Sequence, residues 1–207
     1  MTSIRFEAVI LAGGKSSRLD GWPKARLRLK GITLVERSVR AAAAAEAVVV
    51  VGPADLPVPA GVLRTRETPA FGGPAAALAA GLVALGNARD ESDRAPWTMV
   101  LACDMPEVGR AVQTLVSEVT DDAEGNAYLG VSEDGHQEPL AALYRTAALV
   151  AAFDGEDATD RSVFSFIRRL GIHEVRMPAD ATSDVDTWDA VSRFALDASS
   201  PIDASSH

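Results

Sequence analysis

Short apolar runs alternate with longer segments that suit helices along the first half of the chain. The runs at 8–12 and 47–51 are each followed by glycine, and the run at 97–104 ends in an acid. A shorter strand is expected at 62–67. Continuous apolar runs of this length are typical of strands that are buried on both faces of a parallel sheet.

Helices are expected between these strands. Thr33 and Glu36 fit a capping box, which predicts a helix from this point to about Ala45. Gly73-Pro74 places a proline in a first helical turn, and a further helix is expected at about 107–119. This alternation predicts βαβ units and a mainly parallel sheet.

The second half of the chain is less regular. Segments 127–132 and 138–145 flank a turn-like EDGH sequence, which predicts an antiparallel pair. Thr187 is expected to cap a last helix. The remaining expectations are helices at about 147–153 and 162–170 and a strand at 173–177. We expect one α/β domain over residues 1–196, followed by a flexible tail at 197–207.

The overall charge narrows the range of ligands. A formal net charge of −9 argues against broad binding to nucleic acid or to anionic membranes. The segment 15–30 nevertheless contains six cations and one acid, which favours a small anionic ligand at this place. The cations are Lys15, Arg18, Lys24, Arg26, Arg28 and Lys30.

The single cysteine, Cys103, rules out an internal disulfide framework and suits a reducing compartment. The sequence contains no apolar run long enough to span a bilayer, and its first residues do not resemble a signal peptide. We therefore expect a cytoplasmic protein without membrane contact.

The glycine pair Gly13-Gly14 directly follows the first apolar run. In open parallel sheets ligands bind beyond the carboxyl ends of the strands, where glycines let the backbone approach a nucleotide closely. The Walker A and G-x-G-x-x-G patterns are both absent. The pair is therefore either a nucleotide-binding turn or an ordinary strand-to-loop turn.

Acids follow buried or extended segments at two further places. Asp104 ends the run 97–104, where it is either a Mg²⁺ ligand or a helix N-cap. Asp184 and Asp186 alternate in a segment that we expect to be extended, so their side chains share one side. One of the two could bind an ion together with Asp104, or the pair could serve with Asp189 at a helix start.

Taken in order, five motifs resemble the MobA-like nucleotidyltransferase family, which includes molybdenum cofactor guanylyltransferase. They are LAGGKSSRL with Lys24 following, FGGPAAALAAGL, LACDMP, GHQEPLAALYR and DVDTWDAV, and they extend over about 8–191. The resemblance implies a Rossmann-like three-layer fold with a mixed, mainly parallel sheet. It also implies transfer of a nucleotidyl group to a phosphate, with release of pyrophosphate.

The resemblance assigns roles to individual residues. Lys24, Arg18 and Asp104 would be catalytic, and Asp104 and Asp186 would bind Mg²⁺. Glu67 would lie near the base or the ribose. The full nucleotide-binding set that it implies is Leu11, Ala12, Gly13, Gly14, Lys15, Lys24, Glu67, Gly73 and Asp104.

The loop Leu19-Asp20-Gly21-Trp22-Pro23 departs from the family pattern, in which an R-M-G sequence is followed by D-K. Asp20 stands where glycine is common, and Pro23 replaces the acid before the lysine. The loop should therefore follow a different path. The LAGG sequence resembles the guanylyl branch of the family, whereas cytidylyl relatives tend to have AAG. A second glycine would leave room for a larger purine edge, which favours GTP.

The combined expectation is a Mg²⁺-dependent guanylyltransferase that uses GTP and molybdopterin and that contacts other molybdenum cofactor proteins transiently. Two alternatives remain open. One is a cytidylyltransferase, or a transferase acting on sugar or alcohol phosphates, with the same fold. The other is a nucleotide-binding module that does not turn over.

Overall fold

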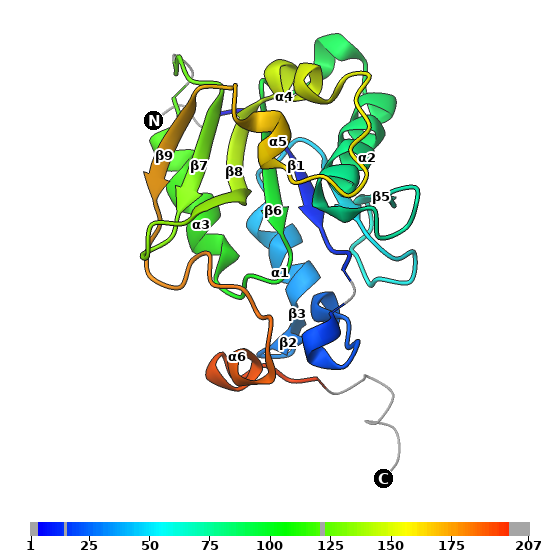
Figure 1. The fold of residues 1–207 in the computed structure, drawn as a ribbon, viewed down its shortest axis with the longest axis vertical. Helices are drawn as coiled ribbons and strands as arrows, with labels where there is room; N and C mark the ends of the chain where they lie inside the picture. Colours follow the sequence, from blue (N-terminus) through cyan, green and yellow to red (C-terminus); the bar gives the residue numbers. More distant parts are fainter. Residues whose placement is uncertain (1–3, 15, 121–122, 199–207) are drawn as a thin grey trace.

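A seven-stranded sheet forms the centre of the computed structural model, which describes residues 4–14, 16–120 and 123–198 (Figure 1). The strand order is β5-β4-β1-β6-β8-β7-β9. β8 pairs antiparallel with both of its neighbours, and the other pairs are parallel. This confirms the predicted mainly parallel sheet. The strands are β1 (Phe6–Leu11), β4 (Val48–Val51), β5 (Leu63–Thr65), β6 (Trp97–Ala102), β7 (Ala127–Val131), β8 (Gln137–Arg145) and β9 (Ile172–Arg176).

Helices cover both faces of the sheet and give the molecule three layers (Figure 1). β1 shows why: all six of its residues are buried, and their side chains alternate between the two faces. Phe6, Ala8 and Ile10 pack towards α1 and α3, whereas Val9 and Leu11 pack towards α2. The helices are α1 (Leu34–Ala41), α2 (Gly73–Ala88), α3 (Val108–Glu118), α4 (Thr146–Phe153), α5 (Phe164–Ile167) and α6 (Trp188–Arg193).

A small separate core packs residues from early in the chain against residues from near its C-terminal end. It contains Leu19, Leu27, Leu34, Val185 and Val191. It lies where α6 packs near the hairpin of β2 (Arg28–Leu29) and β3 (Ile32–Thr33), at one end of the molecule in Figure 1. The sequence did not predict this hairpin.

Two backbone hydrogen bonds link β2 to the segment that follows α6, next to this small core. The amide of Arg28 donates to the carbonyl of Asp197 at 2.8 Å, and the amide of Asp197 donates back at 2.7 Å. Asp197, the first residue of the expected tail, is thereby paired, and residues 199–207 lie outside the described part of the chain. That the chain forms a single domain stays a prediction.

Two helices are shorter than predicted. α1 ends at Ala41 instead of about Ala45, because the amides of Ala43 and Ala45 bond three residues back and that of Glu46 already donates to the carbonyl of Phe6 on the sheet. α5 covers only Phe164–Ile167 of the expected 162–170, since three-residue turns flank it. Both threonine N-caps are confirmed: Thr33 accepts from the amide of Glu36, and Thr187 accepts from that of Ala190.

No helix among the described residues is both long and apolar enough to cross a membrane.

Gly81 lets α2 approach the sheet closely. A Cβ added there would lie 2.5 Å from Val9 Cγ1 and 3.1 Å from Val51 Cγ2. We expect Gly81→Ala to lower the free energy of unfolding by about 1–3 kcal/mol through overpacking, as measured by urea denaturation. Gly109→Ala in α3 is the control, because no described atom lies within 4 Å of its added Cβ. Alanine should leave that helix equally or more stable. Equal stability of the two variants would contradict the close packing.

Candidate active site

The carboxyl ends of β1 and β6 place the glycine pair and Asp104 at the same edge of the sheet. The strands are parallel neighbours in which Leu11 pairs with Ala102. The amide of Cys103 donates to the carbonyl of Leu11 at 3.0 Å, so the two segments are still paired where the strands end. A cavity of about 800 Å³ lies at this edge and is called the site cavity below. Its size is in the range of small-ligand sites.

The loop after the glycine pair follows a path with several left-handed residues. Ser16 has φ 45°, Asp20 has φ 52° and Gly21 has φ 79°. Aspartate tolerates this conformation better than most side chains do, which explains how Asp20 can occupy this position in the loop. The indole N–H of Trp188 donates to the Asp20 carboxylate at 3.0 Å and so ties the loop to α6.

Lys24 connects three distant parts of the chain. It begins a short 3₁₀ turn, Lys24–Arg26, and its Nζ donates to Asp104 Oδ2 at 2.9 Å. The same Nζ also donates to Asp186. Arg18 adds an exposed contact, since its Nη1 lies 3.2 Å from Asp186 Oδ2. Lys24 and Asp104 are each four-fifths buried, so water screens this pair less than it screens the Arg18 pair.

Asp104 does not cap a helix. α3 begins at Val108, its N-cap residue is Glu107, and Asp104 instead pairs with Lys24. Of the two interpretations left open by the sequence, the ligand role therefore fits the geometry and the capping role does not. Its neighbour Cys103 is buried in the core.

The carboxylates near Lys24 shift one another's pKa values. Burial works against the charge of Lys24, but Asp104 and Asp186 outweigh it and raise the pKa of the ammonium group. The hydrogen bond from Lys24 holds the pKa of Asp186 below its usual range. Burial raises the pKa of Asp184, and repulsion from Asp186 and Asp104 raises it further. The site is thus crowded with negative charge that more cationic charge would stabilise.

Asp104, Asp184 and Asp186 form a donor set that suits Mg²⁺. Each offers a carboxylate oxygen, and these oxygens lie within 4.8 Å of one another. Magnesium is bound by oxygen, and it commonly takes one or two protein carboxylates plus phosphate oxygens and water. The Lys24 ammonium group already lies against two of these carboxylates, so the place accommodates a cation. We call these three residues the aspartate cluster.

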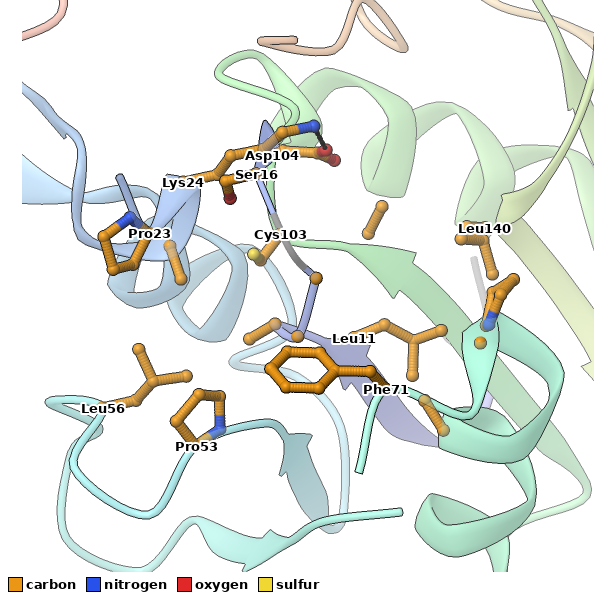
Figure 2. Close-up of a pocket in the computed structure, with 18 of the residues that line it drawn as sticks. Leu11, Ser16, Pro23, Lys24, Pro53, Leu56, Phe71, Cys103, Asp104 and Leu140 are labelled. Atoms are coloured by element: carbon orange, nitrogen blue, oxygen red, sulfur yellow. Dashed lines mark hydrogen bonds and ion pairs between the residues drawn. The ribbon is translucent and has the colours of Figure 1, made fainter. Parts of the chain in front are cut away.

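A second wall of the site cavity is built from other residues. Glu67 is 7% exposed, and its Oε1 accepts the amide of Phe71 at 2.9 Å. Its Oε2 has no hydrogen-bond partner among the described residues. Figure 2 shows the Phe71 ring near Pro53 and Leu56, with the Lys24–Asp104 pair elsewhere in the pocket.

The structure brings most of the expected site residues together. The site cavity is lined by Leu11, Ala12, Gly13, Gly14, Arg18, Lys24, Glu67, Gly73, Asp104 and Asp186. Lys15 lies outside the described residues. Their roles in binding and catalysis stay predictions.

Some lining residues were not predicted. Pro53, Leu56, Phe71 and Leu140 also line the cavity. Pro53 closely follows β4, the strand next to β1. Its position just after a predicted strand could therefore have indicated that it lines the cavity. His136 is exposed on the tip of the β7–β8 hairpin, where it contacts Asp134 and does not line the cavity.

The chain is similar to several known proteins in sequence and in fold. The chain is 34% identical over 186 residues to a probable molybdenum cofactor guanylyltransferase of Opitutus terrae, covering 86% of this chain and 88% of the relative. Among solved structures, Rv0371c of Mycobacterium tuberculosis has a TM-score of 0.67 at 21% identity, with 94% of this chain and 98% of that chain covered.

A third similar protein is molybdopterin-guanine dinucleotide biosynthesis protein A of Archaeoglobus fulgidus. It has a TM-score of 0.65 at 20% identity, with 91% of this chain and 96% of that chain covered. The two structural matches support the fold. Residues 8–174 match the family described as the MobA-like NTP transferase domain, and on this match and the similarity to the Opitutus protein the chain belongs to that family.

Proposed function

We propose that this protein is a molybdenum cofactor guanylyltransferase, which transfers GMP from GTP to the phosphate of molybdopterin and releases pyrophosphate. The observation that carries the proposal is the Lys24–Asp104 pair, which joins the loop after the glycine pair to the end of β6 inside the site cavity. The names of the relatives with 34% identity support it.

The reaction is an in-line displacement. An oxygen of the molybdopterin phosphate forms a bond to the α-phosphorus of GTP, and the bond from that phosphorus to the bridging oxygen breaks. The electron pair leaves with pyrophosphate. An ionised phosphate needs no general base, so the residues mainly have to position two anions and neutralise charge.

The residues around the glycine pair suit that task. Gly13 and Gly14 leave the backbone open to a triphosphate, because neither carries a Cβ. Lys24 and the exposed Arg18 both lie on the cavity wall and can donate charge-assisted hydrogen bonds to phosphate oxygens. Binding of GTP would then exchange contacts of Lys24 with aspartates for contacts with phosphate.

The aspartate cluster would hold a magnesium ion, with Asp104 and Asp186 as its expected ligands. Such an ion, when bound, supplies positive charge next to the phosphate oxygens. The acids of the cluster would then stop repelling the triphosphate.

Glu67 supports guanine as the base. Guanine presents an N–H and an amino group side by side on its Watson–Crick edge, whereas adenine and cytosine present an acceptor nitrogen beside their amino group. A carboxylate only accepts hydrogen bonds, so it pairs with two donors and repels an acceptor. Glu67 Oε2 lies buried at the cavity without a partner among the described residues.

A panel of nucleotides tests the proposed function. The protein is incubated with molybdopterin, Mg²⁺ and each of the four NTPs in turn, and pyrophosphate release is followed. We expect kcat/KM with GTP to exceed that with CTP by about 100-fold or more, because a mismatched base leaves a buried polar group unpaired. Release with CTP alone would contradict the guanylyl assignment. Binding of nucleotides without any release would contradict catalysis.

A further inference from the structure

Phe71 places a large apolar ring at the surface of the site cavity. The residue is 47% exposed, although most large apolar residues of this protein are buried. It follows Glu67 by four positions in the loop between β5 and α2 and lines the cavity. Figure 2 shows the ring extending into the pocket in the neighbourhood of Leu11 and Pro53.

The backbone at Phe71 is strained. Its φ is 64°, in the left-handed region that bulky residues rarely adopt. Glycine would take this conformation without steric cost, and two glycines follow directly at 72 and 73. Strained residues persist mainly where the surroundings hold them, and they gather at ligand sites. The loop thus keeps a phenyl ring at a position where glycine would fit the backbone better.

The same loop couples the ring to Glu67. The amide of Phe71 donates to Glu67 Oε1 at 2.9 Å, so the carboxylate is held against the backbone that carries the ring. The Arg66 guanidinium lies 5.3 Å from the centre of the ring, within cation–π range. The cavity therefore combines a buried acceptor edge with an aromatic face, which together match the edge and the face of a flat heterocycle with N–H donors.

We propose that Phe71 is a specificity-determining residue whose ring stacks on the purine of the bound nucleotide while Glu67 accepts hydrogen bonds from its edge. This inference rests on the proposed function and assigns a role that the family motifs did not suggest. The aspartate cluster and Lys24 bind the triphosphate, so the base binds at the wall of the cavity that contains Phe71. A purine offers the ring a larger face than a pyrimidine does.

The test compares nucleotide binding by the wild-type protein and by Phe71→Leu, Phe71→Trp and Phe71→Gly, with calorimetry as the readout. Leucine keeps an apolar side chain but removes the π face. We expect Kd for GTP to rise about tenfold or more in Phe71→Leu, in line with measured base–aromatic stacking. Tripolyphosphate, which has no base, should bind all variants equally. Phe71→Trp should bind GTP at least as tightly as wild type.

Phe71→Gly separates stacking from a structural role. If the ring serves the ligand, this variant should lose GTP affinity as Phe71→Leu does without a lower Tm, because glycine relieves the positive φ. Phe164→Leu, outside the cavity, is the control for loss of a phenyl ring. Wild-type Kd for GTP in Phe71→Leu, or equal weakening of tripolyphosphate, would overturn the proposal.

The design also separates this proposal from the proposed function. If the wild-type protein prefers a nucleotide other than GTP, the guanylyl assignment fails, and the variants are compared with the preferred nucleotide. An effect of Phe71→Leu on that nucleotide would still support stacking, and the absence of an effect would still overturn it. Titration without molybdopterin ensures that the ring is tested against the nucleotide and not against the pterin.

Discussion

Replacing Asp104 by asparagine is expected to reduce kcat/KM for GTP by about 1,000-fold, the upper range for loss of one electrostatic contact in a transition state. Asparagine keeps the shape and an oxygen near Lys24 Nζ, which now lies 2.9 Å from the carboxylate. It removes the negative charge that we assign to the metal ion. The chemistry should therefore fail while the local structure stays.

The fold should tolerate this change. Asp104 lies in the aspartate cluster, where it raises the pKa of Asp184 by repulsion. Removal of one charge relieves that repulsion but weakens the attraction to Lys24, which keeps its bond to Asp186, so urea denaturation should show only a small change in stability. Asp180→Asn is the matched control, because Asp180 forms an exposed ion pair with Arg193 outside the cavity. Turnover of Asp104→Asn at the wild-type rate would remove Asp104 from the mechanism.

Replacing Lys24 by methionine is expected to raise Kd for GTP by about 100-fold, since hydrogen bonds to charged groups contribute about 1.5–3 kcal/mol each. Methionine keeps the apolar stem and removes the ammonium group. Asp104 and Asp186 then lose their shared cation and repel the triphosphate as well. Both the lost attraction and the new repulsion act in the same direction.

Calorimetry with GTP measures the effect of Lys24→Met directly. Lys30→Met is the matched control, because Lys30 is exposed and does not line the cavity. High salt should weaken GTP binding to wild type more than binding to Lys24→Met, because the salt screens an interaction that the variant lacks. An unchanged Kd in Lys24→Met would contradict both the phosphate contact and the neutralisation of the aspartates by Lys24.

Much of the fold follows from local pattern. Apolar runs ended by Gly13 and by Asp104 predicted two buried strands, and their parallel pairing placed both residues at one edge. The helix from Thr33 was predicted at its start but extended too far into the alanines. Its end depends on the chain returning to the sheet at Glu46, a tertiary contact that helix propensity does not contain.

The sequence indicated most of the individual site residues, but it did not indicate which distant segments pack together to form the site. Asp186 meets Arg18 only because Val185 and Val191 pack with Leu19 and Leu27 in the small core. No local pattern reveals that packing, which joins residues more than 150 positions apart. The alternation of Asp184 and Asp186 offered either of them as a partner of Asp104, and the resemblance to the family singled out Asp186. Phe71 escaped notice because its exposure and positive φ are properties of the folded loop.

The most direct test is a crystal structure with a non-hydrolysable GTP analogue and Mn²⁺ in place of Mg²⁺, using the anomalous signal of manganese. We predict a manganese peak at Asp104 and Asp186, phosphates within hydrogen-bond distance of Lys24 Nζ, and the guanine between Glu67 and Phe71. A nucleotide bound away from the carboxyl ends of β1 and β6, or a metal bound without Asp104, would contradict the account.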